Sequence, residues 1–211
     1  MPMLLLNAFW IFLHNAISLA IGFVLMSFIE YATHRWMLHK NLFVRWFPRA
    51  EIFQEVLRDH AVNHHGHFYK CFNNEADPEG KYTGLFFPLG YYQLLMIFIT
   101  VPMLFVDWVT AVYFSIFVVA HYVGWNQFHK AMHFDEKPWR LWKPWFTYVE
   151  YCHYLHHQHR NKNFNGFLPP VWDVLLGTKA RETDEDREVW RLMQEGQVVD
   201  RKGRPLQASH P

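Results

Sequence analysis

Three long runs of apolar residues, separated by polar segments, set the architecture that the sequence predicts. Residues 2–29, 84–106 and 108–128 contain no Asp, Glu, Lys or Arg. Each run reaches or exceeds the ~20 residues that an α-helix needs to cross a bilayer. We therefore predict an all-α membrane protein with three transmembrane helices, or with four if residues 2–29 form a re-entrant pair.

The first run could alternatively be a cleaved signal peptide. Such a peptide starts with basic residues, has a shorter apolar stretch and ends at a cleavage site of small residues. Residues 2–29 lack the basic start and are apolar over a longer stretch. We therefore expect this run to be a retained membrane helix.

The placement of basic residues predicts the orientation. No Lys or Arg precedes the first run, and none lies between the second and third runs, where Asp107 is the only charged residue. The positive-inside rule then places the N-terminus outside and the other polar segments in the cytoplasm. We expect one membrane-embedded domain over residues 1–180 with a cytoplasmic helical cap, followed by a polar helix and tail over residues 181–211.

Composition excludes some classes of partner. The formal net charge is +1 with histidine neutral, so no broad positive field attracts nucleic acid. No RNA-binding motif is present either. Cys71 and Cys152 form neither a CxxC pair nor a disulfide framework, and we interpret both as reduced thiols on a cytosolic face.

The 15 histidines are the main chemical feature of the chain, and ten of them lie in four tight groups. The groups are His34 with His39; His60 with His64 and His65; His129 with His133; and His153 with His156 and His157. Neutral imidazole binds borderline transition metals near pH 7. Ten rings exceed the ~4–6 ligands that one zinc or iron ion accepts. The sequence therefore predicts two metal ions in one histidine-rich site at the cytoplasmic ends of the apolar runs.

The spacing within the groups carries geometric information. Histidines three or four residues apart, as in the last three groups, share one face of an α-helix. His34 and His39 are five residues apart, as are His60 and His65, so an ideal α-helix would turn each pair away from one another. Either the helix ends at these positions or a π-bulge brings the two rings together.

The order HX4H, HX3HH, HX3H and HX2HH resembles the integral-membrane fatty acid hydroxylase/sterol desaturase superfamily. The segments Asn163-Phe-Asn-Gly166, Val171-Trp-Asp-Val174 and Leu176-Gly-Thr178 are similar to the closing N-[FY]-G…WD…GT signature of that family. Together the motifs cover about residues 30–178. One departure is that the second box of the family usually reads HX2HH. Which of His60, His64, His65 and His67 are ligands therefore stays open.

The resemblance implies a membrane di-iron enzyme that uses O2 to hydroxylate an unactivated C–H bond of a lipid, either a fatty acyl chain or a sterol-like lipid. It implies that the ten grouped histidines hold two Fe ions, which zinc could replace on purification. The chain has no HPGG haem motif, so a separate electron donor of the cytochrome b5 or ferredoxin type is expected. A short unfused chain favours a bacterial inner membrane over the endoplasmic reticulum.

Outer partners of the ligands can also be nominated. A ligating imidazole usually donates its second N–H to a carboxylate or a carbonyl. The candidates are Asp173 of the WD pair, Glu30 one turn before His34, Asp59 beside His60, and Asn163, which could instead cap or bridge its loop. For His121 and His159, a role at the metal site and an ordinary structural contact fit the sequence equally well.

Other functions are compatible with similar histidine boxes. A lipid desaturase would use the same site, and so would a carotenoid ring hydroxylase, although the WD…GT ending favours the fatty acid/sterol branch. A metal transporter or metal-storage protein is the alternative from another class. Transport predicts ligands near the membrane midplane on broken helices, whereas the apolar runs here are nearly free of ligands.

Overall fold

A computed structural model describes residues 2–70, 72, 83–134, 143–197, 199–200 and 202–205. Within these ranges the chain is helical and has no β-strand, apart from one isolated bridge between Val199 and Pro205. The all-α prediction is therefore confirmed for the described residues. The elements are α1 (Pro2–Ala32), η1 (Thr33–Leu38), α2 (Leu42–Trp46), α3 (Glu51–Leu57), η2 (Arg58–Phe68), α4 (Leu89–Leu95), η3 (Met96–Thr100), α5 (Val101–Leu104), α6 (Trp108–Phe134), α7 (Lys143–Gln158), α8 (Val171–Leu175) and α9 (Asp184–Gln194).

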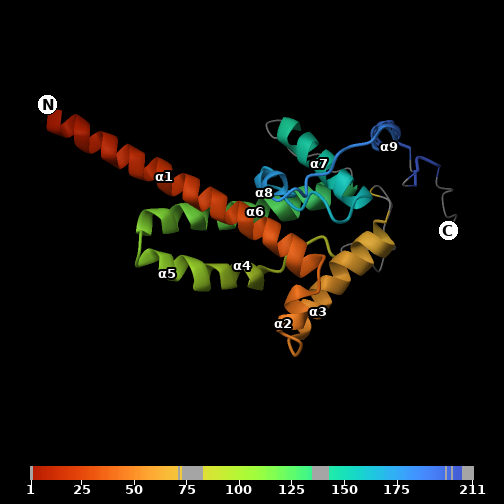
Figure 1. Ribbon diagram of the computed structural model, residues 1–211, viewed down its shortest axis with the longest axis horizontal. Coiled ribbons are helices and arrows are strands. Elements are labelled where there is room, and N and C mark those ends of the chain that lie inside the picture. Colours follow the sequence, from red (N-terminus) through yellow and green to blue (C-terminus); the bar gives the residue numbers. More distant parts are fainter. Residues whose placement is uncertain are drawn as a thin grey trace.

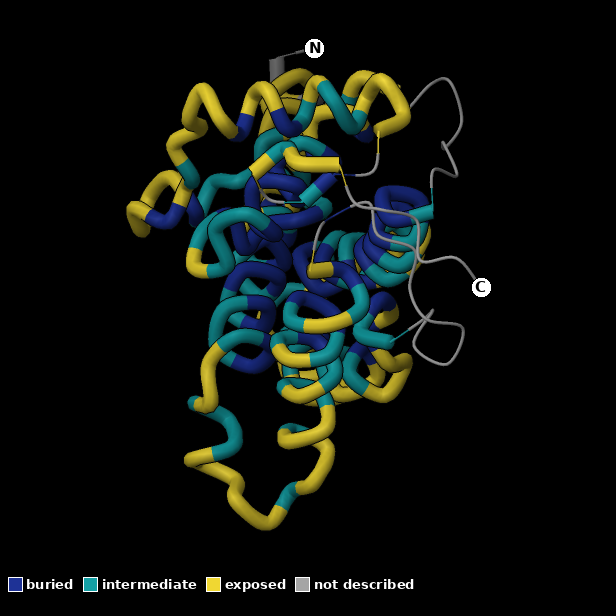
Figure 2. The backbone as a smooth tube through the Cα atoms, turned by 90° about the vertical axis from the view of Figure 1, so that its right-hand side faces the viewer, coloured by how far each residue is buried: buried dark blue, intermediate teal, exposed yellow. Residues whose placement is uncertain are grey.

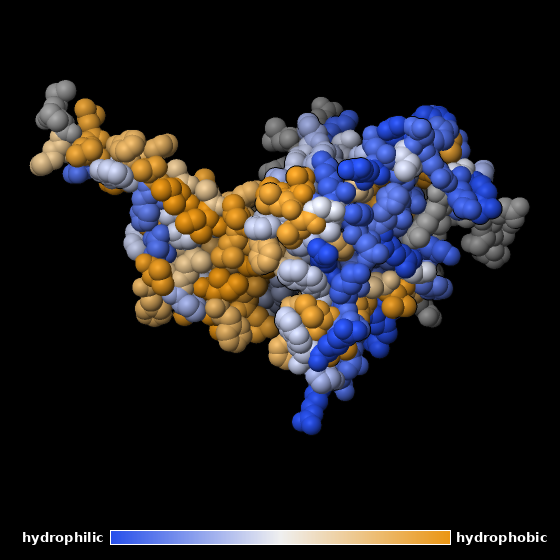
Figure 3. Space-filling view, in the orientation of Figure 1, coloured by the Kyte–Doolittle hydropathy of each residue, from blue (hydrophilic) through white to orange (hydrophobic). Residues whose placement is uncertain are grey.

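Two helical stretches are long and apolar enough to cross a membrane, namely Leu5–Leu38 and Trp108–Phe134. Only 22% and 33% of their most apolar windows are buried inside the protein. Most of their apolar surface therefore faces outward, unlike that of the core helices of a soluble domain. Figure 3 shows apolar residues gathered over α1 and α4–α6, and hydrophilic residues at the opposite end of the molecule.

The middle apolar run forms a shorter helical stretch, Leu89–Leu104, made of α4, η3 and α5. It joins α6 through a short turn, so the two lie side by side as a hairpin (Figure 1). At 1.5 Å per residue the stretch is only about 24 Å long, and a third crossing stays a prediction. The first run is one continuous helix, α1, whereas a re-entrant pair would require that helix to break.

The central packing contact of the fold joins α1 to α6. A Cβ atom on Gly22 would lie 3.0 Å from the backbone nitrogen of Phe114 and 3.3 Å from the ring of Phe117. Glycine therefore allows the two helices to approach closely. At one end of this contact Asp107 accepts hydrogen bonds from Ser18 and Thr110, at 3.4 and 2.5 Å.

The remaining elements gather at the other end of α1 and α6, around two buried apolar clusters (Figures 1 and 2). One cluster contains Trp125 and Phe87 between the long helices and the hairpin. The other contains Phe72, Tyr154 and Val189, by which α9 packs against α7. The histidines contact both clusters, since the Trp125 ring lies 5.4 Å from that of His34 and the Phe72 ring lies 5.7 Å from that of His153.

The C-terminal helix predicted at residues 184–195 is present as α9. Thr183 is its N-cap and forms a capping box with Asp186. Gly196, with a φ of 81°, follows its last turn. Because Val189 of α9 is buried in the second cluster, this helix is part of the packed cap.

We predict that Gly22→Leu destabilises the protein by about 1–3 kcal/mol, because the larger side chain would force α1 away from α6. Gly90→Leu is the matched control, since Gly90 lies in α4 with no neighbour within 4 Å of its Cβ position. Unfolding of the two variants in detergent measures the effect. Equal stability of the two variants would contradict the close approach of the helices.

Candidate metal centre

Two π-helices bring together the histidines that are five residues apart. His34 lies within η1 and His39 directly follows it, and η2 contains His60, His64 and His65. A π-helix joins residues i and i+5 by its hydrogen bonds, so such residues lie on one face. The ring centroids of His34 and His39 are 5.1 Å apart, and those of His60 and His65 are 4.8 Å apart. His60 and His65 thus show the π-helical alternative. For His34 and His39 both alternatives apply, because the π-helix ends at Leu38 and His39 is its C-cap.

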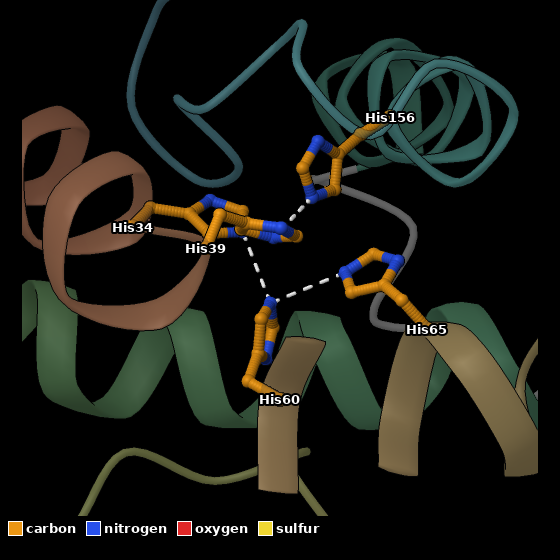
Figure 4. Close-up of side chains that lie close together, drawn as sticks. All are labelled: His34, His39, His60, His65 and His156. Carbon is orange, nitrogen blue, oxygen red and sulfur yellow. Dashed lines mark hydrogen bonds between the residues drawn. The ribbon is translucent and has the colours of Figure 1, made fainter. Parts of the chain in front are cut away.

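The ten grouped histidines meet in one place and form three overlapping sets. Group A is His34, His39, His60, His65 and His156; group B is His64, His129, His133 and His153; a linking set is His64, His65 and His157. Within each set the ligand atoms lie within 4.8 Å of one another. That spread is close to the ~4.2 Å expected across one ion with metal–nitrogen distances near 2.1 Å. Figure 4 shows the five rings of group A pointing toward one another from η1 and the residue that follows it, from η2 and from α7.

All ten rings are withdrawn from solvent. Nine of the residues are buried, and only His39 keeps partial exposure. His34, His129 and His133 lie in the last turns of the two long apolar helices, and the others come from η2 and α7. The site therefore sits where the apolar helices end and the polar cap begins.

Backbone carbonyls hold the outer nitrogen of six of these rings. In each case Nδ1–H donates to a carbonyl oxygen, which leaves Nε2 as the lone-pair nitrogen of the neutral ring. The pairs are His34 with Phe164 (2.7 Å), His60 with Gly84 (3.1 Å), His129 with Leu85 (2.8 Å), His133 with Phe72 (2.9 Å), His156 with Lys162 (2.6 Å) and His157 with Tyr69 (2.9 Å).

The inner nitrogens consequently face one another without a proton to share. Nε2 of His34 and Nε2 of His60 are 3.1 Å apart, and each of these rings already donates through Nδ1. Two lone pairs at that distance repel unless a cation lies between them. Within the described residues, neither ring nitrogen of the fully buried His64 has a hydrogen-bond partner, and Nε2 of His129 has none. The donor set therefore fits metal ions better than an internal hydrogen-bond network.

Burial keeps these imidazoles neutral. It lowers the pKa of His60 from its ordinary value of 6.5 to about 4, and that of His156 to about 3. Burial, followed by repulsion from neighbouring rings, also lowers the pKa of His64, His65 and His153 well below 6.5. Neutral rings are the form that binds metal.

The four candidate outer partners form their hydrogen bonds with groups other than the grouped histidines. Among the described residues, Asp173, Glu30, Asp59 and Asn163 make no hydrogen bond to a grouped histidine. Neutral carbonyls take that place, which avoids burying an additional charge beside the rings. A role of these four residues as outer partners of metal-bound histidines stays a prediction.

Two carboxylates instead clamp the loop that follows the last histidine box. Asp173 accepts hydrogen bonds from the backbone N–H groups of Phe164 and Asn165, at 2.9 and 2.7 Å. Glu30 accepts three from residues 166–168, at 2.6 to 3.0 Å. Because the Phe164 carbonyl holds His34, this clamp orients a ring of group A.

Asn163 and Asp59 have local structural roles. Asn163 adopts a φ of 54°, donates to the carbonyl of Cys152 and accepts from the N–H of Ala180. It therefore bridges its loop, as one sequence alternative held. Asp59 accepts from Asn63 at 3.1 Å.

The undecided histidines lie outside the three sets. His67 is exposed and packs its ring on Phe68. His159, directly after α7, donates from Nε2 to the Asp186 carboxylate at 3.0 Å, which ties this end of α7 to α9. His121 contacts the hydroxyl of Tyr92 at 2.9 Å and lies 3.6 Å from Glu30. The second box therefore contributes His60, His64 and His65 to the site.

Gly84 is a site residue that the sequence did not reveal. Its φ is +70°, and a Cβ atom there would lie 2.6 Å from the carbonyl oxygen of Asp59 and 2.8 Å from Cβ of His64. Only glycine fits this position, and its carbonyl holds His60. The buried cysteine Cys152 is a free thiol, and Cys71 lies outside the described residues.

Comparisons with protein-family models, with curated proteins and with solved structures found no match. The resemblance in the order of the histidine boxes therefore rests on the residues of this chain alone.

We predict that the metal-free protein loses stability as the pH falls below 6.5. The pKa of His60 is about 4 in the fold and 6.5 when unfolded, so the unfolded state binds more protons between these values. For this group alone the loss is about 1.4 kcal/mol per pH unit in that window. Thermal unfolding of metal-free protein at a series of pH values measures it. A flat profile from pH 7 to 4.5 would show that the rings are not buried neutral.

We predict that Asp173→Asn weakens metal binding by about 10–100-fold. The amide can accept at only one atom, whereas the carboxylate accepts three hydrogen bonds from Phe164, Asn165 and Thr178. Competition with a chelator measures the affinity. Asp184→Asn, at a side chain that is 97% exposed, is the control. Equal affinities of the two variants would argue against the loop clamp.

Proposed function

We propose that this protein is an O2-dependent di-iron oxidoreductase of a membrane that hydroxylates a C–H bond of a lipid. The observation that carries the proposal is the pair of adjoining groups of buried imidazoles whose Nε2 lone pairs face one another. Group A would hold one ion and group B the other. His64, His65 and His157 lie between the two positions.

The donor set supports a redox metal. Nitrogen donors of intermediate softness suit iron as well as zinc, and zinc could occupy the site on purification. When bound, a pair of iron ions would supply electrons for O2 activation, which zinc cannot do. The chain would fix the ligands through six backbone carbonyls and exclude water with the rings of Trp125, Phe164 and Phe72, which pack against the histidines.

The position of the site supports a lipid substrate. His34, His129 and His133 belong to the two apolar helices whose surface faces outward. In this proposal α1 and α6 cross the bilayer, the Leu89–Leu104 stretch makes the third crossing, and the cap and C-terminus are cytoplasmic. The distribution of Lys and Arg supports that orientation, and a bacterial inner membrane is the proposed location.

The reaction needs a reductant, and we propose a separate carrier of the cytochrome b5 or ferredoxin type. Desaturation on the same site differs only in the position of the substrate relative to the oxidant. Whether the product is an alcohol or an alkene is decided by experiment.

We predict that iron-loaded protein with lipid extract, reductant and O2 yields lipids that are heavier by about 16 Da. His64→Ala should lower the product at least about 100-fold, because it removes a ring shared by two sets. His67→Ala, outside the sets, should leave it unchanged. Mass spectrometry of the lipids and an oxygen electrode provide the measurements.

The other outcomes are equally informative. A loss of about 2 Da would identify a desaturase. Iron binding without O2 consumption, together with metal flux across vesicles, would overturn the oxygenase proposal in favour of transport.

A further inference from the structure

A cleft of about 240 Å³ opens on the surface beside group A. One wall is formed by α3 and the start of η2, and the facing wall by residues 84–88, with Leu38 and Trp125 also lining it. Of the ten grouped histidines, His60 is the one that lines this cleft. Among the described residues, the cleft therefore forms a route by which a ligand could pass from the surface to the ring of His60.

The lining of the cleft is apolar apart from Glu55, Asp59 and His60, and the cleft adjoins exposed apolar residues of α4. At the mouth, Ile52 and Phe86 are 52% and 45% exposed. Pro88 lines the cleft, and the next residue, Leu89, is 53% exposed at the start of α4. Leu89 in turn lines a groove between α4 and α6. An aliphatic chain could thus lie in the groove along α4 with its end near the cleft.

Two carboxylates lie in the cleft about one helical turn apart. Glu55 is exposed. Asp59 is partly buried, accepts a hydrogen bond from Asn63 and lies 3.9 Å from the guanidinium of Arg58, so Glu55 is the main source of negative charge in the cleft. Arg58 itself does not line the cleft, and neither does any other described Lys or Arg. A lipid whose polar end is a carboxylate would meet like charge there, whereas a hydroxyl could donate a hydrogen bond and an ammonium would be attracted.

The size of the cleft limits what enters. Pockets for drug-sized ligands have volumes of ~300–1,000 Å³, so a cleft of about 240 Å³ accommodates only part of a long-chain lipid. The carboxylates favour the polar end and its first carbons, with the rest of the chain on the apolar surface of α4.

We propose that this cleft between α3–η2 and residues 84–88 is the port through which a single-chain lipid with a neutral or cationic polar end reaches group A. The inference rests on the proposed function for the substrate being a lipid. It adds the route and the charge of the polar end.

Photo-cross-linking tests the port without requiring turnover. The probes are an alkyl amine, an alkyl alcohol and an alkyl carboxylic acid of equal chain length, each with a diazirine next to the polar end. We expect the amine and alcohol to label residues 52–60 and 84–88 of the full chain in detergent. The acid should label them about five-fold less, in keeping with the strength of exposed charge interactions.

Two pairs of variants sharpen the test. Val56→Trp should fill the cleft and lower labelling by the alcohol at least about ten-fold, whereas Val62→Trp, on the exposed part of η2, should not. Glu55→Gln should raise labelling by the acid toward that by the alcohol, whereas Glu51→Gln, outside the cleft, should not. If Val56→Trp fails to bind metal, the glutamate pair alone decides the outcome.

Equal labelling by the three probes, or labelling that Val56→Trp leaves unchanged, would overturn the proposal. So would cross-links confined to other parts of the chain. Labelling of the cleft as expected, without O2 consumption by the iron-loaded protein, would support the port and overturn only the oxygenase function.

Discussion

Ten buried imidazoles meet with their ligand nitrogens close together, an arrangement that a cation would stabilise. Nε2 atoms 3.1 Å apart, on rings that already donate through Nδ1, cannot form a hydrogen bond with one another. Burial also disfavours protonation, which would otherwise supply the missing donor. The elements around the site are consistent with this single requirement. They place rings from distant parts of the chain at short range and fix the tautomer of six of the rings through backbone carbonyls.

The rings are brought together by segments whose backbone departs from regular α-helix. η1 and η2 are π-helical, which places residues five apart on one face. Gly84 has a positive φ and packs against Asp59 and His64, and its carbonyl holds His60. The loop after the last histidine box is clamped at both ends, by Glu30 from α1 and by Asp173 from α8. Through that loop, the long apolar helix α1 is connected to the orientation of His34 and His156.

Much of this arrangement could be predicted from the sequence. The hydrogen-bond partners of the rings could not, for a physical reason. Helical class, the grouping of ten histidines and the alternative of π-helical turns come from residue type and spacing alone. The partners of the rings do not, because a backbone carbonyl has no side-chain signature. Tyr69 and Leu85 give no sign in the sequence that their carbonyls hold His157 and His129. The sequence nominates Asp173 and Glu30 as candidate outer partners of the rings, but the groups that they bind are N–H groups of a loop whose course depends on tertiary packing. The middle helix is also shorter than its apolar run. Residues 84–88 are apolar but precede α4, which begins at Leu89, and composition alone does not distinguish them from the helix.

Metal analysis of the purified full-length chain, combined with X-ray absorption at the metal edge, tests the central claim most directly. The account predicts two ions per chain and a first coordination shell dominated by imidazole nitrogen, at about 2.0–2.2 Å. A single ion per chain, or a first shell of mainly oxygen or sulfur ligands, would contradict it.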